Sequence, residues 1–378
     1  MSAAPRVLGI DPGTLSFDVC GREGERLTLD RSLPTAEVGR RPEVLIDLLR
    51  AAGPVDLVVG PSGYGLPWVG VADAGPREID LLLLGDAGDG PRGTIVGGMG
   101  RIVAALKESG LPVCFAPGVI HLASVPGHRK VNRIDMGTAD KLCAVALGVW
   151  DQARRYALPY EETSFVYLEL GGAFTAVIAV QGGTVVDGAG GTSGAVGYLA
   201  CGALDGELAY LMRGFSKGSL ASGGVAYVAG APGSDPGDLA AAAPGEGRAA
   251  VAWEAFFEGV LKQVGAEMTV LEAPREILLS GRLSRVPWVA DEVTRRLRRF
   301  APVRRVEGYA EVAKEAAQGA ALIGQGLVGG ALAGLVETMG LRAASGSALD
   351  HLYVKDMDDV RRRYRQSEPG PAPFWERG

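Results

Sequence analysis

Apolar and polar positions in the first part of the chain predict three strands followed by alternating helices and strands. Residues 6–20 contain an apolar run, an Asp-Pro-Gly turn and a second run of alternating polarity, a pattern typical of two strands joined by a tight turn. A third strand fits 26–33. Helical periodicity then predicts helices over 42–52, 98–109 and 137–156, with buried strands between them at 55–59 and 112–116.

The second part of the chain repeats this order. Residues 165–180 again predict strand, Gly turn and strand, and a third strand fits 184–187. Further segments predict helices over 249–268, 288–299 and 311–338, and strands over 276–279 and 302–306. Asp11 and Glu169 occupy equivalent turn positions. Each half therefore reads βββαβαβα, and such a duplication predicts an α/β fold of two similar domains with a cleft between them.

The repeat sets the expected domain limits. We predict an N-terminal domain over 1–157 and a C-terminal domain over 158–340. An insertion near 221–248 is expected at the surface of the second domain, because 230–248 is rich in Pro, Gly and Ala. The remaining residues, 341–378, are charged and Pro-rich, which predicts a solvated helix and a frayed end.

Composition narrows the class of protein. The 378 residues carry 38 Lys and Arg against 44 Asp and Glu, and the net charge of −6 argues against broad nucleic-acid binding. No apolar run reaches the roughly 20 residues of a membrane span, and the residues before the first strand lack a basic-then-apolar pattern, so we expect neither a membrane span nor a signal region. The four cysteines are scattered, so we expect reduced thiols in a cytoplasmic protein, with Cys114 and Cys143 as buried small hydrophobes.

The turns carry the candidate chemistry. In Gly9-Ile10-Asp11-Pro12-Gly13-Thr14, Gly13 lets backbone N–H groups approach phosphate oxygens, and Thr14 adds a hydroxyl donor. Asp11, at the end of a buried strand, could hold Mg²⁺ through its waters. Taken alone, however, Asp-Pro-Gly is also an ordinary hairpin turn.

Two further turns strengthen the case. The second repeat has Glu169, then Gly171 and Gly172, then Thr175, which offers a similar backbone cradle. The third, Ser280-Gly281, follows a hydrophobic strand, where Gly lets a nucleotide lie against the backbone. The alternative for Ser280 is a helix N-cap.

The order of these motifs resembles that of the sugar kinase, Hsp70 and actin superfamily, and the resemblance covers roughly residues 6–335. The motifs are Asp-x-Gly-Thr, then Glu-x-Gly-Gly-x-x-Thr, then a Ser-Gly turn. The resemblance implies two ribonuclease-H-like (actin-like ATPase) domains that bind ATP and Mg²⁺ in the cleft between them. On this basis Gly13 and Thr14 would contact the γ-phosphate and Gly171 and Gly172 the β-phosphate. Gly281, after Ser280, would lie beside the adenosine.

Within the superfamily, the segments 203–220 and 133–141 resemble the acetate and butyrate kinase branch, and the chain is similar to a family labelled predicted butyrate kinase. Two departures matter. Glu169 stands where superfamily members more often have Asp, which would displace a metal contact by about a methylene. The His-Gly-Thr of acetate kinases appears as Met136-Gly137-Thr138, without the His.

The missing His needs a substitute that stabilises the transferred phosphoryl group. Arg129 and Arg133 are the candidates, because a planar guanidinium binds carboxylate or phosphate bidentately, and a solvated loop is the alternative. Asp140 either orders Mg²⁺ waters or caps its helix, and the metal candidates are Asp11 and Glu169. Asp18 is expected at the strand surface.

The expected function is an ATP- and Mg²⁺-dependent phosphotransferase that acts on a small carboxylic acid. The alternatives are a nucleotide-dependent ATPase switch of the same fold, and a scaffold that has lost its chemistry. We expect no nucleic-acid or membrane partner. The resemblance to acetate and butyrate kinases favours a homodimer.

Overall fold

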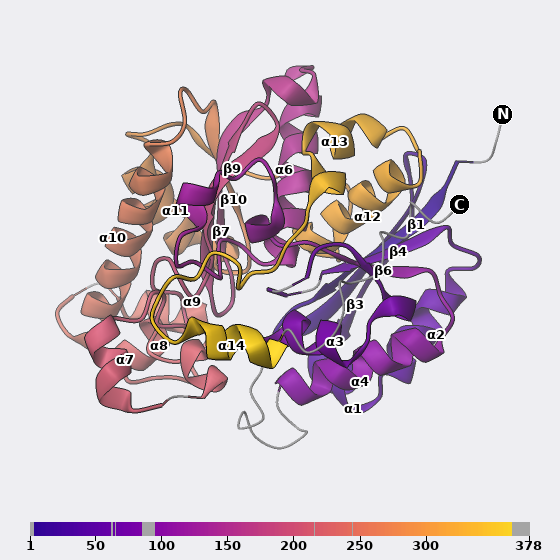
Figure 1. The fold of residues 1–378 in the computed structure, drawn as a ribbon. Helices are drawn as coiled ribbons and strands as arrows, with labels where there is room; N and C mark the ends of the chain where they lie inside the picture. Colours follow the sequence, from indigo (N-terminus) through magenta and orange to yellow (C-terminus); the bar gives the residue numbers. More distant parts are fainter. Residues whose placement is uncertain are drawn as a thin grey trace. The chain divides into compact units, whose positions relative to one another are not determined.

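The protein is described by a computed structural model of residues 4–364, apart from 62, 65, 85–94, 215 and 244. Contacts within the chain divide it into two compact units. Unit 1 comprises residues 1–134, 138–156 and 307–378, and unit 2 comprises 135–137 and 157–306. Each unit is built around one sheet (Figure 1).

The sheet of unit 1 has six strands in the order β3-β2-β1-β4-β6-β5. The first three strands form an antiparallel meander, whereas β1, β4 and β6 run parallel, and the short β5 pairs antiparallel with β6 at the edge. The register of the first hairpin places Asp11 opposite Asp18. The strands are β1 Arg6–Pro12, β2 Ser16–Glu23, β3 Arg26–Pro34, β4 Leu57–Pro61, β5 Val69–Gly70 and β6 Val113–Ala116.

Helices cover both faces of this sheet. Leu8 and Ile10 of β1 point to one face, where they join the apolar core that α2 and α4 complete. Gly9 and Asp11 alternate with them and face α12, which packs beside α6. The helices of unit 1 are α1 Thr35–Arg40, α2 Glu43–Ala51, α3 Pro76–Leu83, α4 Ile95–Glu108, α5 Gly127–Lys130, α6 Ala139–Tyr156, α12 Glu315–Leu327, α13 Ala333–Thr338 and α14 Met357–Tyr364.

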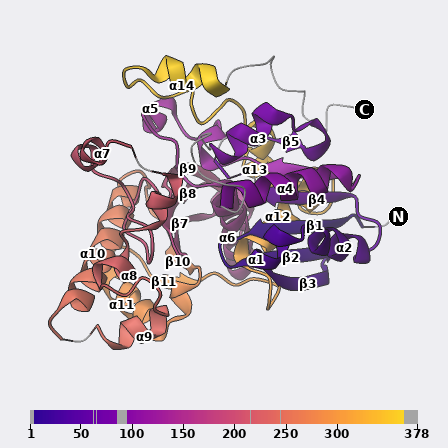
Figure 2. The ribbon, with the colours of Figure 1, turned by 90° about the horizontal axis from the view of Figure 1, so that it is seen from below.

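Glycines allow α12 to approach its neighbours closely. A Cβ atom at Gly9 would lie 2.1 Å from the carbonyl oxygen of Ala317, and one at Gly319 would lie 1.7 Å from that of Cys143. Only glycine fits at either position without a shift of the backbone. The small residues of α12 thus bring it against both β1 and α6, and the two helices lie side by side in both ribbon views (Figures 1 and 2).

The five-stranded sheet of unit 2 has the order β11-β10-β7-β8-β9, the same topology as β6-β4-β1-β2-β3 in unit 1. Its strands are β7 Ser164–Leu170, β8 Thr175–Gln181, β9 Thr184–Ala189, β10 Glu276–Ser280 and β11 Val303–Arg305. Its helices are α7 Gly206–Met212, α8 Val225–Val228, α9 Pro236–Ala241, α10 Arg248–Met268 and α11 Pro287–Leu297. The two sheets confirm the predicted duplication.

The predicted surface insertion near 221–248 is wrong in part. Leu239 and Ala240 of α9, with Ala243, are buried in the core of unit 2. The indole Nε1 of Trp253 in α10 donates to the Leu239 carbonyl oxygen at 3.2 Å. The Ala-rich run therefore packs as a small-residue helix against aromatic side chains instead of lying free at the surface.

The helix expected over 311–338 is two helices, α12 and α13. Gly329 adopts a left-handed φ of +78° between them, which ends the first helix. Residues 307–340, which the sequence assigned to the second domain, have their contacts in unit 1. The compact units therefore do not coincide with the expected domain limits.

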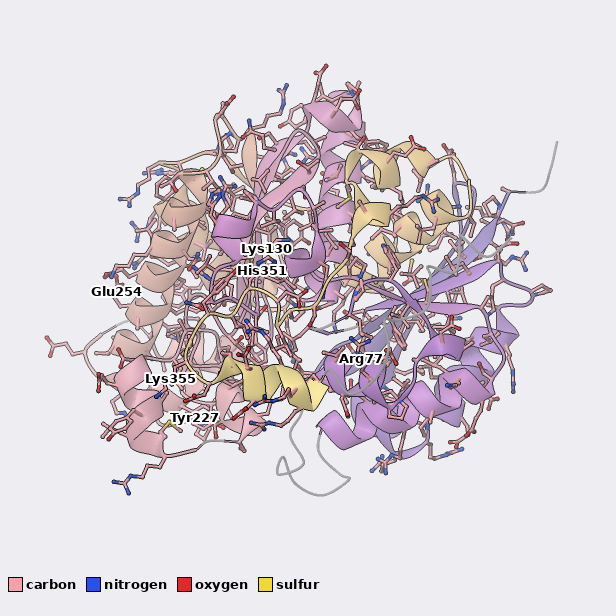
Figure 3. All side chains as sticks on the ribbon, viewed as in Figure 1. Arg77, Lys130, Tyr227, Glu254, His351 and Lys355 are labelled. Carbon is pink, nitrogen blue, oxygen red and sulfur yellow. The ribbon has the colours of Figure 1, made fainter. Side chains whose placement is uncertain are left out.

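The tail after residue 341 packs more than expected. Leu341, Leu349 and Leu352 are buried in unit 1, and Met357 and Tyr364 of α14 pack partly buried against the same unit, although no residue of α14 is fully buried. Arg77, labelled with His351 in Figure 3, donates through Nε to the carbonyl oxygen of Tyr364 at 3.2 Å. The tail is charged overall, but the apolar residues spaced along it pack against unit 1, and for this reason it is more buried than its composition predicts. The Pro-rich end, 365–378, lies outside the described residues.

Candidate functional site

Asp11 is a buried carboxylate at the carboxyl end of β1. Only 6% of the residue is exposed, and its side chain makes no hydrogen bond to any described residue. The turn that follows is fixed by the N–H of Gly13, which donates to the Asp11 carbonyl oxygen at 3.0 Å, and Thr14 is exposed at its tip. Burial of a carboxylate without a hydrogen-bond donor is costly, so Asp11 marks a site that a ligand can complete.

Lys314 lies against this turn from the start of α12. Its Nζ donates to the Ser16 hydroxyl at 2.6 Å and lies 2.8 Å from Oδ2 of Asp18, which is 1% exposed. A Cβ atom at Gly13 would lie 2.9 Å from this Nζ. Gly13 therefore leaves room for an ammonium group beside the turn.

The start of α6 contributes a second charged pair. Oδ2 of Asp140 lies 2.6 Å from Nζ of Lys141, and Oδ1 accepts a hydrogen bond from the Thr138 hydroxyl. The N–H of Ala139 donates to the Gly63 carbonyl oxygen at 3.1 Å, which ties the start of α6 to the segment after β4. The start of α6 thus adds Asp140 and Lys141, and the N-cap of α12 adds Lys314, to the two carboxylates of the first hairpin. Together they form a cluster of five charged groups at the end of β1: Asp11, Asp18, Asp140, Lys141 and Lys314.

The carboxylates of this cluster differ in their acidity. Burial and the nearby Asp140 raise the pKa of Asp11 from 3.8 to about 7, although Lys314 and Lys141 act in the opposite direction. Burial would also raise the pKa of Asp140, but the Lys141 ammonium and the hydrogen bonds from Lys141 and Thr138 lower it overall. Asp140 therefore stays ionised while Asp11 can exchange a proton near neutral pH.

The donor set fits Mg²⁺ better than a metal held by protein alone. The described residues contain no group of three or more His, Cys, Asp or Glu side chains placed to hold an ion. Mg²⁺ commonly takes one or two carboxylates together with waters and phosphate oxygens. A buried Asp11 with no hydrogen-bond donor, near an ionised Asp140, meets this requirement.

In unit 2 the predicted glycine turn joins β7 and β8. The N–H of Gly171 donates to the Phe174 carbonyl oxygen at 2.9 Å, and a Cβ atom at Gly171 would lie 2.6 Å from that oxygen. Gly172 has room for a Cβ atom. Thr175 is 1% exposed, and its hydroxyl has no hydrogen-bond partner among the described residues. Glu169 is half-buried on β7.

Ser280 ends β10 and is not the N-cap of a helix, because the next helical turn has Arg282 as its N-cap. Its hydroxyl is buried and finds no partner among the residues described. Gly281 has a φ of +86°, and a Cβ atom there would lie 2.4 Å from the Leu170 carbonyl oxygen. The glycine is therefore required by close packing against the end of β7.

The structure places Arg129 in the short α5 and Arg133 three residues beyond its end. Arg133 is exposed, and its N–H donates to the Lys130 carbonyl oxygen at 3.0 Å. Lys130 is buried, and its Nζ donates to the Leu122 carbonyl oxygen at 2.8 Å. This geometry shows how the segment is held and leaves the roles of both arginines as predictions.

Sequence reasoning missed both lysines and was wrong about Asp18. Asp18 is buried and paired with Lys314 instead of lying at the strand surface. The signal was its register opposite Asp11, which puts the two side chains on the same face of the sheet. Nothing in the sequence near Lys314 indicated its partner, because 296 residues separate it from Asp18.

Two other findings bear on the expected properties. All four cysteines are free thiols, and Cys114 and Cys143 are buried as predicted. Burial raises the pKa of both thiols above the ordinary value. Among the described residues, none of the helices has the length and apolar character needed to span a bilayer.

Solved structures with the same fold include carboxylate kinases. A propionate kinase from Francisella tularensis subsp. tularensis SCHU S4 matches with a TM-score of 0.58 and 12% identity, covering 83% of this chain and 98% of that chain. An acetate kinase from Porphyromonas gingivalis matches with a TM-score of 0.52 and 16% identity, covering 77% and 86% respectively. An acetate kinase from Entamoeba histolytica matches with a TM-score of 0.52 and 10% identity, covering 78% and 86%.

These similarities establish the fold. The chain has the duplicated ribonuclease-H-like fold of the actin-like ATPases, as the sequence resemblance implied. Identities of 10–16% are too low to carry a substrate from those kinases to this protein. Residues 9–354 match the family described as "Protein of unknown function (DUF1464)", and the chain belongs to that family.

Proposed function

We propose that this protein is an ATP- and Mg²⁺-dependent phosphotransferase that makes an acyl phosphate from a small carboxylic acid, in the manner of a butyrate kinase. The observation that carries the proposal is Asp11, a buried carboxylate without a hydrogen-bond partner among the described residues, at a glycine turn flanked by two lysines. The fold shared with acetate and propionate kinases supports it.

In the proposed reaction a carboxylate oxygen of the acid attacks the γ-phosphorus of ATP. The bond from that phosphorus to the β,γ-bridging oxygen breaks, and its electron pair leaves with ADP. No general base is required, because a carboxylic acid is already ionised near neutral pH. The protein must instead hold the reactants in line and neutralise the phosphoryl oxygens.

Unit 1 would supply the groups nearest to the transferred phosphoryl group. Asp11 and Asp140 would hold Mg²⁺, which neutralises phosphate charge when it is bound with ATP. The backbone at Gly13 and the exposed Thr14 would contact the γ-phosphate. Both helices that start here point their positive dipole ends towards the cluster, which favours a bound anion.

Unit 2 would bind the rest of the nucleotide through its own turns. We assign the backbone of Gly171 and Gly172 to the β-phosphate and the Ser280-Gly281 turn to the adenosine. Two buried hydroxyls in these turns, those of Thr175 and Ser280, have no partner among the described residues and so have donors to offer. Glu169 remains a candidate metal contact of this unit, and Arg129 and Arg133 candidates for the phosphoryl group.

The test is an acid-dependent assay for ADP formation, with the acyl phosphate trapped by hydroxylamine. A panel of straight and branched acids of two to six carbons should include at least one that stimulates ADP release and yields a hydroxamate. ADP formation that is the same with and without every acid would contradict the kinase and support an ATPase switch. Absence of both nucleotide binding and turnover would support a scaffold.

A further inference from the structure

We propose that Lys314, held by Asp18 and Ser16 beside the Gly13 turn, binds the transferred phosphoryl group, with Lys141 as a second cation. The inference deepens the proposed function and rests on it. It assigns the neutralising charge to two lysines of unit 1 in place of the His that acetate kinases carry at the position of Met136.

The ammonium group of Lys314 is held in place and still has a donor to offer. An ammonium group has three donors, and the described residues accept from two of them, the Ser16 hydroxyl at 2.6 Å and the Asp18 carboxylate at 2.8 Å. The side chain is 36% exposed, so the third donor can reach a ligand. A Cβ atom at Gly13 would lie 2.9 Å from this Nζ. The third donor of Lys314 is therefore beside the turn that we propose for the γ-phosphate.

The backbone that carries Lys314 is fixed before α12 begins. The Asp30 carboxylate accepts hydrogen bonds of 2.6–3.2 Å from three consecutive N–H groups of residues 311–313. The side-chain amide of Gln318 holds the same loop. Its oxygen accepts hydrogen bonds from the N–H groups of residues 309 and 310, and its nitrogen donates to the carbonyl oxygen of Ala313 at 2.7 Å. Such rigid support is what a charge-stabilising group requires.

Both lysines stand where the local electrostatics of a helix disfavour them. Lys314 is the N-cap of α12, and Lys141 lies in the first turn of α6, whereas cations favour helix C-termini. The chain also contains only seven lysines against 31 arginines. Two of these seven lysines lie in one cluster, and both are at a helix N-terminus, where a cation is unfavourable. Such local conflicts are expected at functional sites.

The charges of the cluster also suit a bound Mg²⁺–phosphate group. Asp11, Asp18 and Asp140 carry up to one more negative charge than the two lysines neutralise, so a cation that is bound with phosphate oxygens would complete the charge balance, and the partly exposed Lys314 lies beside the turn proposed for the phosphate. Lysine is a compact point charge with three donors, well matched to an oxygen-rich group whose orientation changes during transfer.

Chemical labelling tests this on the unaltered protein. Calorimetry first establishes saturating concentrations of Mg-ATP and of Mg-tripolyphosphate, which lacks the nucleoside. Limited acetylation followed by peptide mass spectrometry then measures each lysine with and without the probe. We expect several-fold protection of Lys314 and Lys141 by either probe. Lys262, paired with Glu258 on the exposed face of α10, is the control and should label equally throughout.

Variants give a second, independent measurement. Lys314→Gln should weaken both probes about tenfold or more, which is the size of a charge-assisted hydrogen bond, and Lys314→Arg should recover part of the loss. Lys262→Gln should leave both affinities unchanged. Thermal melting of each variant checks that it is folded.

The outcomes separate this inference from the proposed function. If Mg-ATP binds but Lys314 labels equally with and without it, or a folded Lys314→Gln protein binds like the original, the ion pair with Asp18 is only structural and the inference is overturned. If the original protein binds neither probe, the proposed function itself fails.

Discussion

Asp11 combines two properties that rarely occur together in a stable core, burial and a carboxylate with no hydrogen-bond donor among the described residues. Its pKa of about 7, against an ordinary 3.8, follows from burial first and from Asp140 second. The folded protein therefore holds the Asp11 proton more tightly than the unfolded chain does. Asp11 stabilises the fold fully below about pH 4, and this contribution is lost as the pH rises through 7.

Replacement of Asp11 should consequently stabilise the protein at high pH. We expect Asp11→Asn to raise the melting temperature at pH 8 and to have little effect at pH 5, since Asn lacks the buried charge. The pKa difference sets an upper limit on the order of 4 kcal/mol. Melting curves across pH 5–8 measure it, with Asp47→Asn on the exposed side of α2 as control. An equal effect of Asp11→Asn at both pH values would contradict the buried-charge account.

The residues of the site differ in how far the sequence predicted them. The sequence singled out Asp11 and Gly13 because strand and turn are local patterns, and the roles of both residues remain predictions. Lys314 was not, since its contact with Asp18 arises only when α12 packs against β2. Asp18 was misplaced because a single alternating strand does not reveal that both of its faces are covered.

At the scale of the elements, close helix packing sets the position of the cluster. Gly9 and Gly319 let α12 approach β1 and α6, and this approach brings the first turns of both helices to the end of β1. The break at Gly329 was missed, because the apolar, small-residue pattern continues across it.

Matched glycine substitutions test this packing. Gly319→Ala should destabilise the protein by at least ~2 kcal/mol, because the new Cβ would lie 1.7 Å from the Cys143 carbonyl oxygen. Gly100→Ala, in α4 with nothing within 4 Å, should be neutral or stabilise by up to ~1 kcal/mol through helix propensity. Urea unfolding gives both free energies, and the account of α12 packing fails if the two variants behave alike.

The Ala-rich segment around α9 makes a second prediction at this scale. Leu239→Ala should cost roughly 2–4 kcal/mol, because Leu239 is buried in the core that contains Trp253. Leu211→Ala on α7, where the side chain is 71% exposed, should change the stability by less than ~0.5 kcal/mol. If both variants lose equally little unfolding free energy, the segment around α9 lies at the surface, as its composition suggested, and the buried packing of α9 is wrong.

At the scale of the whole molecule, the repeat in the sequence predicted the duplicated fold, because the two βββαβαβα patterns are each local and regular. The distribution of the chain between the units was not predicted, since the last helix of the second repeat packs in unit 1. A linear pattern identifies an element but does not show which sheet it covers. The acceptor is likewise beyond the sequence, because chain-length specificity depends on the volume of the acceptor pocket.

The central claim is that Asp11 holds the Mg²⁺ of a bound nucleotide, and calorimetric titration with Mg-ATP and a non-hydrolysable analogue tests it most directly. We predict saturable binding by the original protein and by Asp47→Asn, and loss of binding by at least about tenfold in a folded Asp11→Asn protein, as expected when a charged ligand contact is removed. Undiminished binding by Asp11→Asn, or no binding by the original protein at any pH between 6 and 8, would contradict the account.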